Sequence, residues 1–257
     1  MNVKAKKHLG QHFLTDENIA KKIVEGLDFQ PYQYVLEVGP GTGVLTKYLL
    51  EKPTETYVAE IDTESIEYLK LHYQKFENKH FTGDFLKINL SDVFSGEVAV
   101  IGNFPYNISS QILFKIIENY QQIPEMVGMF QKEVAERTAA VPRTKDYGIL
   151  SVLVQAYYDV KYLFTVHENV FNPPPKVKSG VIKLTRNRKD GLEGNEILFK
   201  QIVKTGFGQR RKKLSNALKS LDIPEVLKSH AFMDKRAEEL SVEDFINFTQ
   251  EWKAAKN

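Results

Sequence analysis

The feature that most constrains this chain is the alternation of short apolar runs with stretches of helical periodicity. Residues 34–38 form a mainly apolar run that leads into a glycine-rich turn, and residues 44–49 then have the apolar spacing of a helix. Apolar runs recur at residues 56–61 and 98–102. Strands that alternate with helices are joined by right-handed crossovers, which makes the strands parallel. The sequence therefore predicts an α/β domain with a Rossmann-like, mostly parallel sheet.

More strands follow along the chain before the pattern becomes helical near its end. Further strands are expected at residues 80–82, 126–130, 157–166 and 177–185, the last two adjacent and therefore antiparallel. Residues 187–195 are polar, charged and glycine-bearing, as linkers are. Later helices are expected at residues 197–207, 212–221 and 224–230 and from Ser241 onward. We expect an α/β domain at residues 1–190, with a basic arm at 1–15, and a small all-helical domain at 191–257.

Composition excludes several kinds of site. The 257 residues include no cysteine, which rules out disulfides and thiolate metal sites, and the six histidines form no ligand pattern with carboxylates. No apolar run approaches the roughly 18 residues of a transmembrane helix, and the charged start of the chain has no apolar segment behind it. We expect a cytoplasmic, monomeric protein that binds neither metal nor membrane.

The net charge of +2 is small, but the basic side chains are unevenly placed. The N-terminal arm has three lysines and no acid, namely Lys4, Lys6 and Lys7. A denser group stands at a predicted helix start and consists of Arg210, Arg211, Lys212 and Lys213. Cations there oppose the helix dipole by about 0.3–1 kcal/mol each, so contact with the phosphates of a nucleic acid explains them better than local stability does. A solvated charged face, and an arm without a binding role, are the alternatives.

The turn after the first predicted strand has the spacing of a nucleotide-binding turn. Gly39, Gly41 and Gly43 let the backbone approach a ligand that a Cβ atom would exclude. A dinucleotide fingerprint has Gly or Ala three residues after its second glycine, where this chain has Val44. The spacing therefore favours S-adenosylmethionine over NAD. A glycine turn needed only for tight strand-to-helix packing is the alternative.

Acidic side chains follow the next two strands at the same edge of the sheet, where open α/β sheets bind ligands. Glu60 ends one strand, and a carboxylate there can accept both ribose hydroxyls of an adenosyl group. Asp84 is placed to accept from the exocyclic amine of adenine, with Phe85 as a stacking face. Each residue alone is explained as a solvated acid or a core aromatic. Their order along successive strands favours a cofactor site.

The fourth predicted strand runs directly into Asn103-Phe104-Pro105-Tyr106. The N6 amine of adenine is a poor nucleophile because its lone pair is delocalised into the ring. The side-chain oxygen of Asn103 and a backbone carbonyl held by Pro105 can accept the N6 hydrogens and direct the lone pair at a methyl carbon. Tyr106 offers a face for the base, worth about 1–3 kcal/mol. A packed turn at the end of a strand is the alternative.

These motifs resemble the ribosomal RNA adenine N6,N6-dimethyltransferases, and among them the bacterial KsgA/RsmA branch, over nearly the whole chain. The matching segments include residues 10–14, 37–41, 60–62, 83–84, 103–109, 131–134, 171–177 and 207–218. Three positions depart from the family's usual residues: His12, Phe104 and Lys178 stand where Asn, Leu and Asp are common. None of the three removes a group that the methyl-transfer chemistry requires.

The resemblance implies a class I methyltransferase domain followed by a helical rRNA-binding domain. It implies that two adjacent adenosines in the loop of the 3′-terminal hairpin of 16S rRNA are methylated within the immature 30S subunit. Phe171 would close on the target adenine opposite Tyr106, with a core aromatic as the alternative. The cofactor contacts expected from the motifs and the resemblance are His12, Leu14, Gly39, Gly41, Glu60, Ile61, Asp84, Phe85 and Asn103.

Three other functions stay open. A macrolide-resistance methyltransferase that acts on large-subunit rRNA shares the cofactor and Asn-x-Pro-Tyr motifs, although residues 171–177 and 210–212 argue against it. A non-enzymatic assembly or transcription factor can be built on the same fold, but intact Asn103 and Tyr106 favour an enzyme. An NAD oxidoreductase is least expected, because nothing near the sheet edge resembles a hydride-transfer acid or base.

Overall fold

The computed structural model describes residues 3–256, which divide into two compact units. The first runs to Ala135 and includes Val160–Arg186, whereas the second contains Glu136–Asp159 and the chain from Asn187 onward. The expected boundary after residue 190 is close to the junction at Arg186. Residues 136–159 were expected in the first domain but belong to the helical unit, because α7 (Ile149–Gln155) packs against α8 (Glu196–Gly208).

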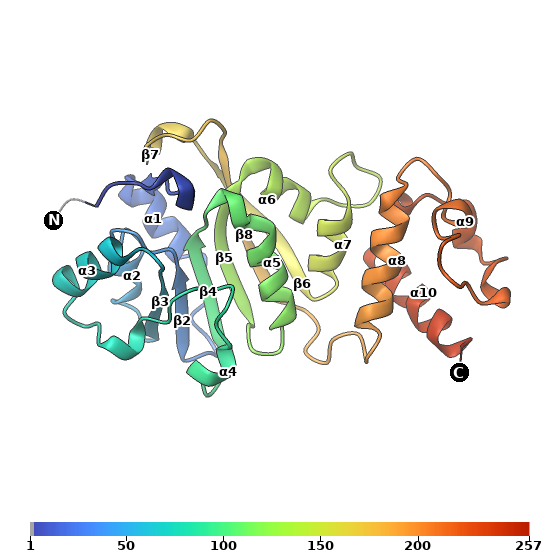
Figure 1. Ribbon diagram of the computed structural model, residues 1–257, viewed down its shortest axis with the longest axis horizontal. Helices are drawn as coiled ribbons and strands as arrows, with labels where there is room; N and C mark the ends of the chain where they lie inside the picture. The colour runs from blue at the N-terminus through green and yellow to red at the C-terminus, as the bar shows by residue number, and fades with distance from the viewer. Residues whose placement is uncertain (1–2, 257) are drawn as a thin grey trace. The chain divides into compact units, whose positions relative to one another are not determined.

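The main sheet has the mostly parallel arrangement that the sequence predicts (Figure 1). Its spatial order is β3 (Glu55–Ala59), β2 (Tyr34–Val38), β4 (Val98–Asn103), β5 (Glu125–Gln131), β8 (Ser179–Arg186) and β6 (Tyr158–Val166). β3, β2, β4 and β5 pair in parallel, and β8 is antiparallel to β5. Val35, Val100 and Val127 are fully buried, as expected for parallel strands with both faces covered.

Helices flank these strands in the order of an α/β fold. In chain order, the helices from the N-terminal arm to the end of β5 and just beyond it are α1 (Glu17–Val24), α2 (Thr46–Leu49), α3 (Thr63–His72), α4 (Leu90–Val93), α5 (Ser109–Glu118) and α6 (Lys132–Ala139). α1 begins at Asp16, whose carboxylate accepts the backbone N–H groups of Asn18 and Ile19. Its buried face, with Ile23 fully covered, belongs to the core that lies against β2 and β5.

The direction of the chain through the sheet reverses next to β2. The chain passes from β2 outward to β3 and then crosses back to β4 on the other side of β2. In open α/β sheets, ligands bind outside the carboxyl ends of the strands at such a switch point. A short strand of the N-terminal arm, β1 (Phe13–Leu14), pairs with β7 (Phe171–Asn172) in a separate antiparallel ladder.

The second unit is helical, which confirms the small helical C-terminal region. After α7 and α8 come α9 (Leu214–Ala217) and α10 (Val242–Ala254), separated by short 3-10 helices. The helix expected at residues 212–221 has only the four residues of α9, and residues 218–223 form a turn that leads to Pro224. The segment expected to be helical at 224–230 contains a 3-10 helix, η5 (Glu225–Leu227).

The prediction of a strand at residues 80–82 was wrong. The structure has a 3-10 helix, η2 (Asn78–His80), and an isolated parallel bridge between Val58 and Phe81. Gly83 follows with φ +80, a backbone conformation that turns the chain away from the direction of a strand. The pairing with β3 therefore ends after one bridge.

Candidate active site

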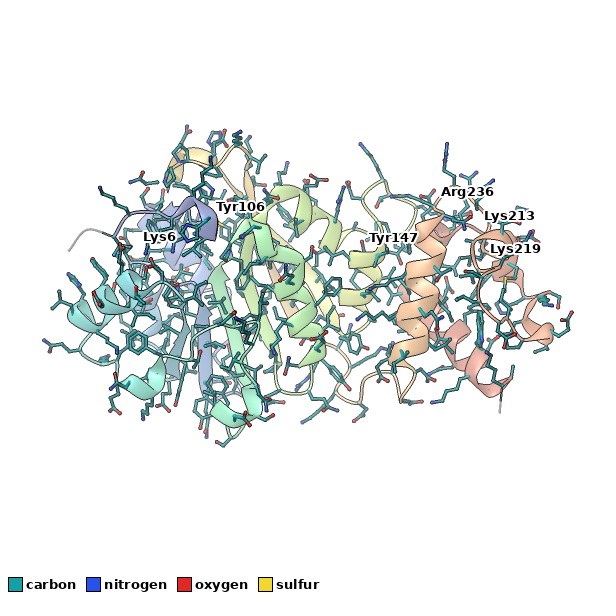
Figure 2. All side chains as sticks on the ribbon, viewed as in Figure 1. Lys6, Tyr106, Tyr147, Lys213, Lys219 and Arg236 are labelled. Carbon is teal, nitrogen blue, oxygen red and sulfur yellow. The ribbon has the colours of Figure 1, made fainter. Side chains whose placement is uncertain are left out.

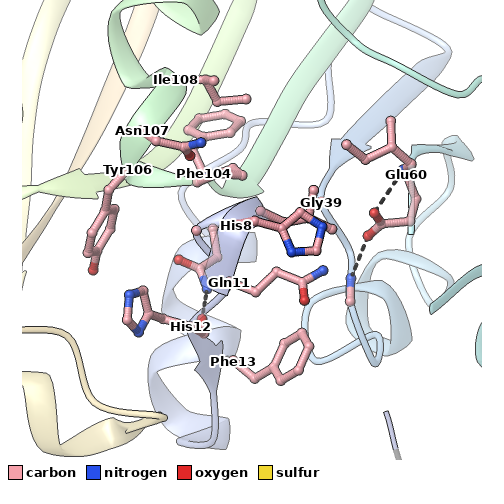
Figure 3. A pocket seen from close by; sticks show the side chains of 16 residues that line it. His8, Gln11, His12, Phe13, Gly39, Glu60, Phe104, Tyr106, Asn107 and Ile108 are labelled. Carbon is pink, nitrogen blue, oxygen red and sulfur yellow. Dashed lines mark hydrogen bonds between the residues drawn. The ribbon is translucent and has the colours of Figure 1, made fainter. Parts of the chain in front are cut away.

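The segments that follow β2, β3 and β4 meet the N-terminal arm around one cavity of the first unit (Figure 3). The cavity lies where the strand order reverses, at the carboxyl ends of β2 and β4. Eight of the expected site residues line it, namely His12, Gly39, Gly41, Glu60, Ile61, Asn103, Pro105 and Tyr106. Residues spread over almost one hundred positions of the sequence are thus brought together at one edge of the sheet.

Other expected residues do not line this cavity, namely Leu14, Asp84, Phe85 and Phe171. Leu14 lines a second, small cavity that shares Phe13, Gly39 and Asn103 with the first, and it pairs in register with Phe171, which is only 4% exposed. Asp84 accepts the backbone N–H of Leu86 at 3.0 Å, and Phe85 is buried. In this arrangement Phe171 is part of the core and Asp84 caps its own turn, so their ligand contacts stay predictions.

Asn103 ends β4 with its amide held in one orientation. Its Nδ2 atom donates to the carbonyl oxygen of His12 at 2.8 Å, a bond that Figure 3 marks with a dashed line. A carbonyl only accepts hydrogen bonds, so the nitrogen must face the arm and Oδ1 must face away from it. Within residues 3–256 this Oδ1 accepts no hydrogen bond. The amide therefore presents a fixed, unsatisfied acceptor.

A second acceptor follows directly in the chain. The backbone N–H of Phe104 donates to the Met129 carbonyl, and the Pro105 carbonyl accepts the N–H of Ile108 at 3.3 Å. The Phe104 carbonyl lies between these two bonds and accepts none from the part of the chain that the structure describes. Pro105 fixes the backbone at this point with φ −58. Two free acceptors are thus held next to each other by the strand end and the proline.

Tyr106 opens the 3-10 helix η3 (Tyr106–Ile108), and its ring is fixed at both ends. The hydroxyl lies 2.5 Å from Oγ of Ser179, and the ring stacks on His12 with centroids 5.5 Å apart and planes at 26°. Burial raises the pKa of the Tyr106 hydroxyl, against the smaller effect of the Ser179 hydrogen bond. A neutral, oriented aromatic ring is available to stack on a planar ligand.

His12 is held by its ring as well as by its carbonyl. Its Nδ1 atom lies 2.8 Å from the carbonyl oxygen of Pro173, and since that oxygen only accepts, Nδ1 carries a proton. The arm is thereby connected to the loop that precedes β8. Neither this bond nor the role of Ser179 was predicted, because the partners lie 161 and 73 residues apart in sequence and carry no local signal.

Glu60 directly follows β3 with its carboxylate turned toward the glycine turn. Oε1 accepts the backbone N–H groups of Ile61 and Asp62 at 2.8 and 2.9 Å, and Oε2 accepts that of Gly41 at 3.3 Å. Burial raises the pKa of Glu60, although these backbone bonds act in the opposite direction. Because its one hydrogen bond, to Gly41, is long, Oε2 is less strongly hydrogen-bonded than Oε1 and is the oxygen better able to accept from a ligand in the cavity.

The glycine turn provides the floor of the cavity. A Cβ atom on Gly39 would lie 3.9 Å from Cδ of Pro105 and would fill space between the turn and residues 103–106. At Gly41, with φ +54, a Cβ atom would come within 2.7 Å of the Phe13 ring. The first glycine keeps space for a ligand, and the second allows the arm to approach the turn closely.

The expected basic residues differ in how they are bound. Lys6 forms ion pairs with Asp62 and, at 3.1 Å, with Glu64, whereas Lys4 and Lys7 are exposed. The helix expected from residue 212 begins at Leu214 with Lys213 as its N-cap, so residues 209–213 form the turn that leads from α8 into α9.

Within that turn the four expected cations have different surroundings. Arg210 pairs with Glu238, and Lys213 pairs with Asp234 at 2.9 Å. Arg211 lines a cavity of the second unit together with Arg143. Lys212 is exposed.

Residues 3–256 contain neither a candidate membrane-spanning helix nor a candidate metal site. No helix there is both long and apolar enough to cross a bilayer, and no three His, Asp or Glu side chains are grouped so as to hold a metal ion.

Comparison with known proteins gives a consistent result. The family model for ribosomal RNA adenine dimethylase matches residues 2–254. The ribosomal RNA small subunit methyltransferase A of Flavobacterium johnsoniae is 59% identical, over 98% of this chain and 97% of its own length. The protein of the same name from Cytophaga hutchinsonii is 56% identical, over 96% of both chains.

Solved structures agree with this match. A dimethyladenosine transferase from Plasmodium falciparum superposes with a TM-score of 0.83 at 26% identity and covers 95% of this chain and 98% of its own. The 23S rRNA methyltransferase ErmE superposes at 0.69 with 24% identity, over 94% and 99% of the two chains, which bears on the fold alone. The sheet and its helices have the Rossmann-like class I methyltransferase fold, and the chain belongs to the ribosomal RNA adenine dimethylase family.

Proposed function

We propose that this protein transfers methyl groups from S-adenosylmethionine to N6 of two adjacent adenosines in the loop of the 3′-terminal hairpin of 16S rRNA, within the immature 30S subunit. The observation that carries the proposal is the pair of free acceptors, Asn103 Oδ1 and the Phe104 carbonyl, on two residues that line the cavity. The relatives named as small-subunit methyltransferases support this substrate over large-subunit rRNA.

The residues around the cavity fit S-adenosylmethionine. The buried Glu60 carboxylate suits two ribose hydroxyls, with Oε2 held only by a long bond to Gly41. Ile61 is 57% exposed beside it and offers an apolar side chain on which adenine can lie. The space that a Cβ on Gly39 would fill leaves room between the turn and Asn103. When bound, this cofactor supplies an electrophilic methyl group on a sulfonium.

The chain's own residues orient the adenine that receives the methyl group. Asn103 Oδ1 and the Phe104 carbonyl accept the two N6 hydrogens, which turns the nitrogen lone pair out of conjugation with the ring. The new N–CH₃ bond places positive charge on N6, and the acidified nitrogen then releases a proton to solvent, so no side-chain base is needed. Tyr106 stacks on the base and offsets part of the few kcal/mol that unstacking it costs. Phe171 is expected to close on the other face.

Basic residues outside the cavity would hold the RNA backbone. Lys4, Lys7, Arg211 and Lys212 are exposed cations that suit phosphate contacts, and hairpin loops present splayed bases to an enzyme of this kind. Arg210 and Lys213 are partly neutralised by acidic neighbours. We expect the protein to act as a monomer in the cytoplasm, where ribosomal subunits mature.

The test is methyl transfer to ribosomal particles. Purified protein with labelled S-adenosylmethionine should label immature 30S subunits from cells that lack this activity, with the label on N6,N6-dimethyladenosine. Asn103→Ala should abolish transfer, because it removes one acceptor and the bond that fixes the arm. Labelling of 50S particles instead, or equal labelling by the variant, would contradict the proposal.

A further inference from the structure

The N-terminal arm passes over the cavity between two attachments of different kinds. On the C-terminal side, β1 pairs with β7, Leu14 is buried and the His12 carbonyl accepts the Asn103 amide. On the N-terminal side, Val3 is buried, and the polar contacts of Lys6 and Gln11 hold the chain that follows it. The segment between the attachments, residues 8–12, lines the cavity. Any ligand in the cavity therefore lies against a strap that strand pairing fixes at one end, and that buried Val3 and the contacts of Lys6 and Gln11 hold at the other.

The N-terminal attachment centres on Lys6, which Figure 2 labels. Its ammonium pairs with Asp62 and, at 3.1 Å, with Glu64. Its backbone N–H donates to Oε1 of Gln11 at 2.8 Å, and Nε2 of Gln11 lies 3.5 Å from Oδ2 of Asp62. Lys6 and Gln11 thus bring both ends of the arm's 3-10 turn, η1 (Lys7–Leu9), to the same carboxylate.

Asp62 is a buried charge that needs these partners. Its side chain is 1% exposed, and a buried carboxylate without a cation or hydrogen bonds is strongly unfavourable. Burial alone would raise the pKa of Asp62, but hydrogen bonds from Lys6, Ser65 and Gln11 hold it below its usual value. The hydrogen bond to Asp62 in turn raises the pKa of Lys6. Both groups are charged at neutral pH, so the pair persists there.

The same short loop holds the arm and the cofactor carboxylate. Glu60, which lines the cavity, accepts the backbone N–H of Asp62 at 2.9 Å. Asp62 also begins α3 and accepts the N–H of Glu64 at 3.3 Å. A displacement of Asp62 therefore moves the backbone group that orients the Glu60 carboxylate. The attachment of the arm and the binding of a ribose are linked through two residues.

We propose that Lys6 is a positioning residue for the cofactor: its ion pair with Asp62 holds the arm over the cavity and slows the departure of the bound nucleoside. The proposal rests on the proposed function, which supplies the nucleoside. It assigns Lys6 a different task from Lys4 and Lys7. Those two lysines are exposed and suit RNA phosphates, whereas Lys6 already has two carboxylates as partners.

The test measures how fast S-adenosylhomocysteine leaves the full-length protein. Lys6→Met removes the cation, and Asp62→Asn removes the anion while keeping a good N-cap for α3. Each is expected to raise the dissociation rate about tenfold, and the double variant is expected to raise it no further, because both remove one interaction. Lys6→Arg is expected to restore the wild-type rate.

A matched control separates the effect of the Lys6–Asp62 ion pair from general effects of charge. Lys79→Met removes a lysine that pairs with Glu55 at 3.2 Å on the same unit and does not line the cavity. It changes the net charge equally and should leave the dissociation rate unchanged. Trypsin cleavage after Lys7 gives a second readout: S-adenosylhomocysteine should protect this bond in the wild type and protect it less in Lys6→Met.

Several outcomes would overturn the proposal. Unchanged dissociation rates in both single variants would do so. A double variant whose fold-increase in dissociation rate equals the product of the two single fold-increases would do so as well. Weaker binding of 30S subunits by Lys6→Met at an unchanged dissociation rate would assign Lys6 to RNA instead. A wild-type protein that does not bind S-adenosylhomocysteine at all would contradict the proposed function itself, so the two failures are distinguishable.

Discussion

At the scale of single residues, Glu37 shows how the site combines burial with a carboxyl group. It lies in β2 directly before the glycine turn, is 1% exposed and accepts the Thr46 hydroxyl at 2.6 Å. Burial raises the pKa of Glu37 to about 8, the Thr46 bond acts against this, and the charge of Glu60 adds to it. The folded protein therefore holds a neutral Glu37 near neutral pH.

Replacement of Glu37 by Gln tests this protonation state. Because the folded-state pKa lies above the ordinary value of 4.5, the folded protein keeps a proton that the unfolded chain has released. The free energy of unfolding should thus fall as pH rises from about 5 to about 8, by a few kcal/mol at most, and the loss should be absent in Glu37→Gln. Chemical denaturation of both proteins at several pH values measures the difference.

The control for this experiment is Glu51→Gln, which removes an exposed carboxyl of the same unit. It should leave the pH dependence of stability as in the wild type. A Glu37→Gln protein whose stability falls with pH as steeply as the wild type would show that Glu37 is ionised in the fold. The Gln side chain can still accept the Thr46 hydroxyl, so the packing at this point is preserved.

Residue roles were predictable where a motif carried them and not where they depend on a partner. The order of Gly39, Glu60 and Asn103 after successive strands was enough to place them on one cavity. Local sequence could not separate Lys6 from Lys7, because the two lysines differ in their contact with Asp62, which lies 56 residues from Lys6. In the same way, the hydroxyl partner of Tyr106 could not be found from local sequence.

At the scale of elements, Phe104 explains why two central strands contain glycine. A Cβ atom on Gly128 of β5 would lie 2.1 Å from the Phe104 ring, and one on Gly102 of β4 would lie 2.8 Å from it. Phe104 is 1% exposed and fills the space that these glycines leave, with its ring centroid 4.8 Å from that of Phe130. The larger residue at a position where the family usually has Leu is thus accommodated by the sheet beneath it.

Gly128→Ala should therefore overpack the sheet next to the catalytic turn. We expect the free energy of unfolding to fall by about 1–3 kcal/mol, because Phe104 cannot move without displacing residues 103–106. Part of the loss should be recovered by Phe104→Leu in the same chain, and Gly96→Ala, where a Cβ meets nothing within 4 Å, should be nearly neutral. Equal stability of Gly128→Ala and wild type in denaturant titrations would contradict this packing.

Elements were predicted well where they have a long apolar period and poorly where they are short. β2, β4 and β5 are buried on both faces, which gives them continuous apolar runs in the sequence. The start of α9 was predicted too early, because the polar and charged residues 209–213 have no apolar period that marks where the turn ends and the helix begins. Its conformation depends on a distant partner, since Leu214 donates its N–H to the carbonyl of Lys235.

At the scale of the whole molecule, the division into two units separates methyl transfer from the densest basic group. The cavity belongs to the first unit, and residues 209–213 belong to the second. The second unit has a depression lined from three separate segments by four cations and three carboxylates, namely Arg143, Arg211, Lys213, Arg236, Asp234, Glu238 and Glu239. The Arg143 N–H donates to the Glu238 carbonyl, and Lys213 is bridged to Arg236. Lys213 and Arg236 are labelled in Figure 2.

Arg210 and Arg211 are neighbours in sequence with different surroundings. Arg210 pairs with Glu238 and donates to the Thr144 carbonyl at 3.1 Å, which ties the turn to the loop before α7. Arg211 has no ion pair or hydrogen bond from its side chain to any residue between 3 and 256. We therefore expect Arg211 to contact RNA phosphate and Arg210 to support the surface on which Arg211 stands.

Binding of 30S subunits at several salt concentrations distinguishes the two arginines. Arg211→Met should weaken binding and reduce the slope of log K against log salt by about one, while the free energy of unfolding stays as in the wild type. Arg210→Met should lower that free energy, because it leaves Glu238 without its partner. Lys219→Met removes an exposed lysine of the same unit and should change neither quantity. An Arg211→Met protein with an unchanged salt slope would exclude this arginine from the phosphate contacts and leave the RNA affinity to other basic residues.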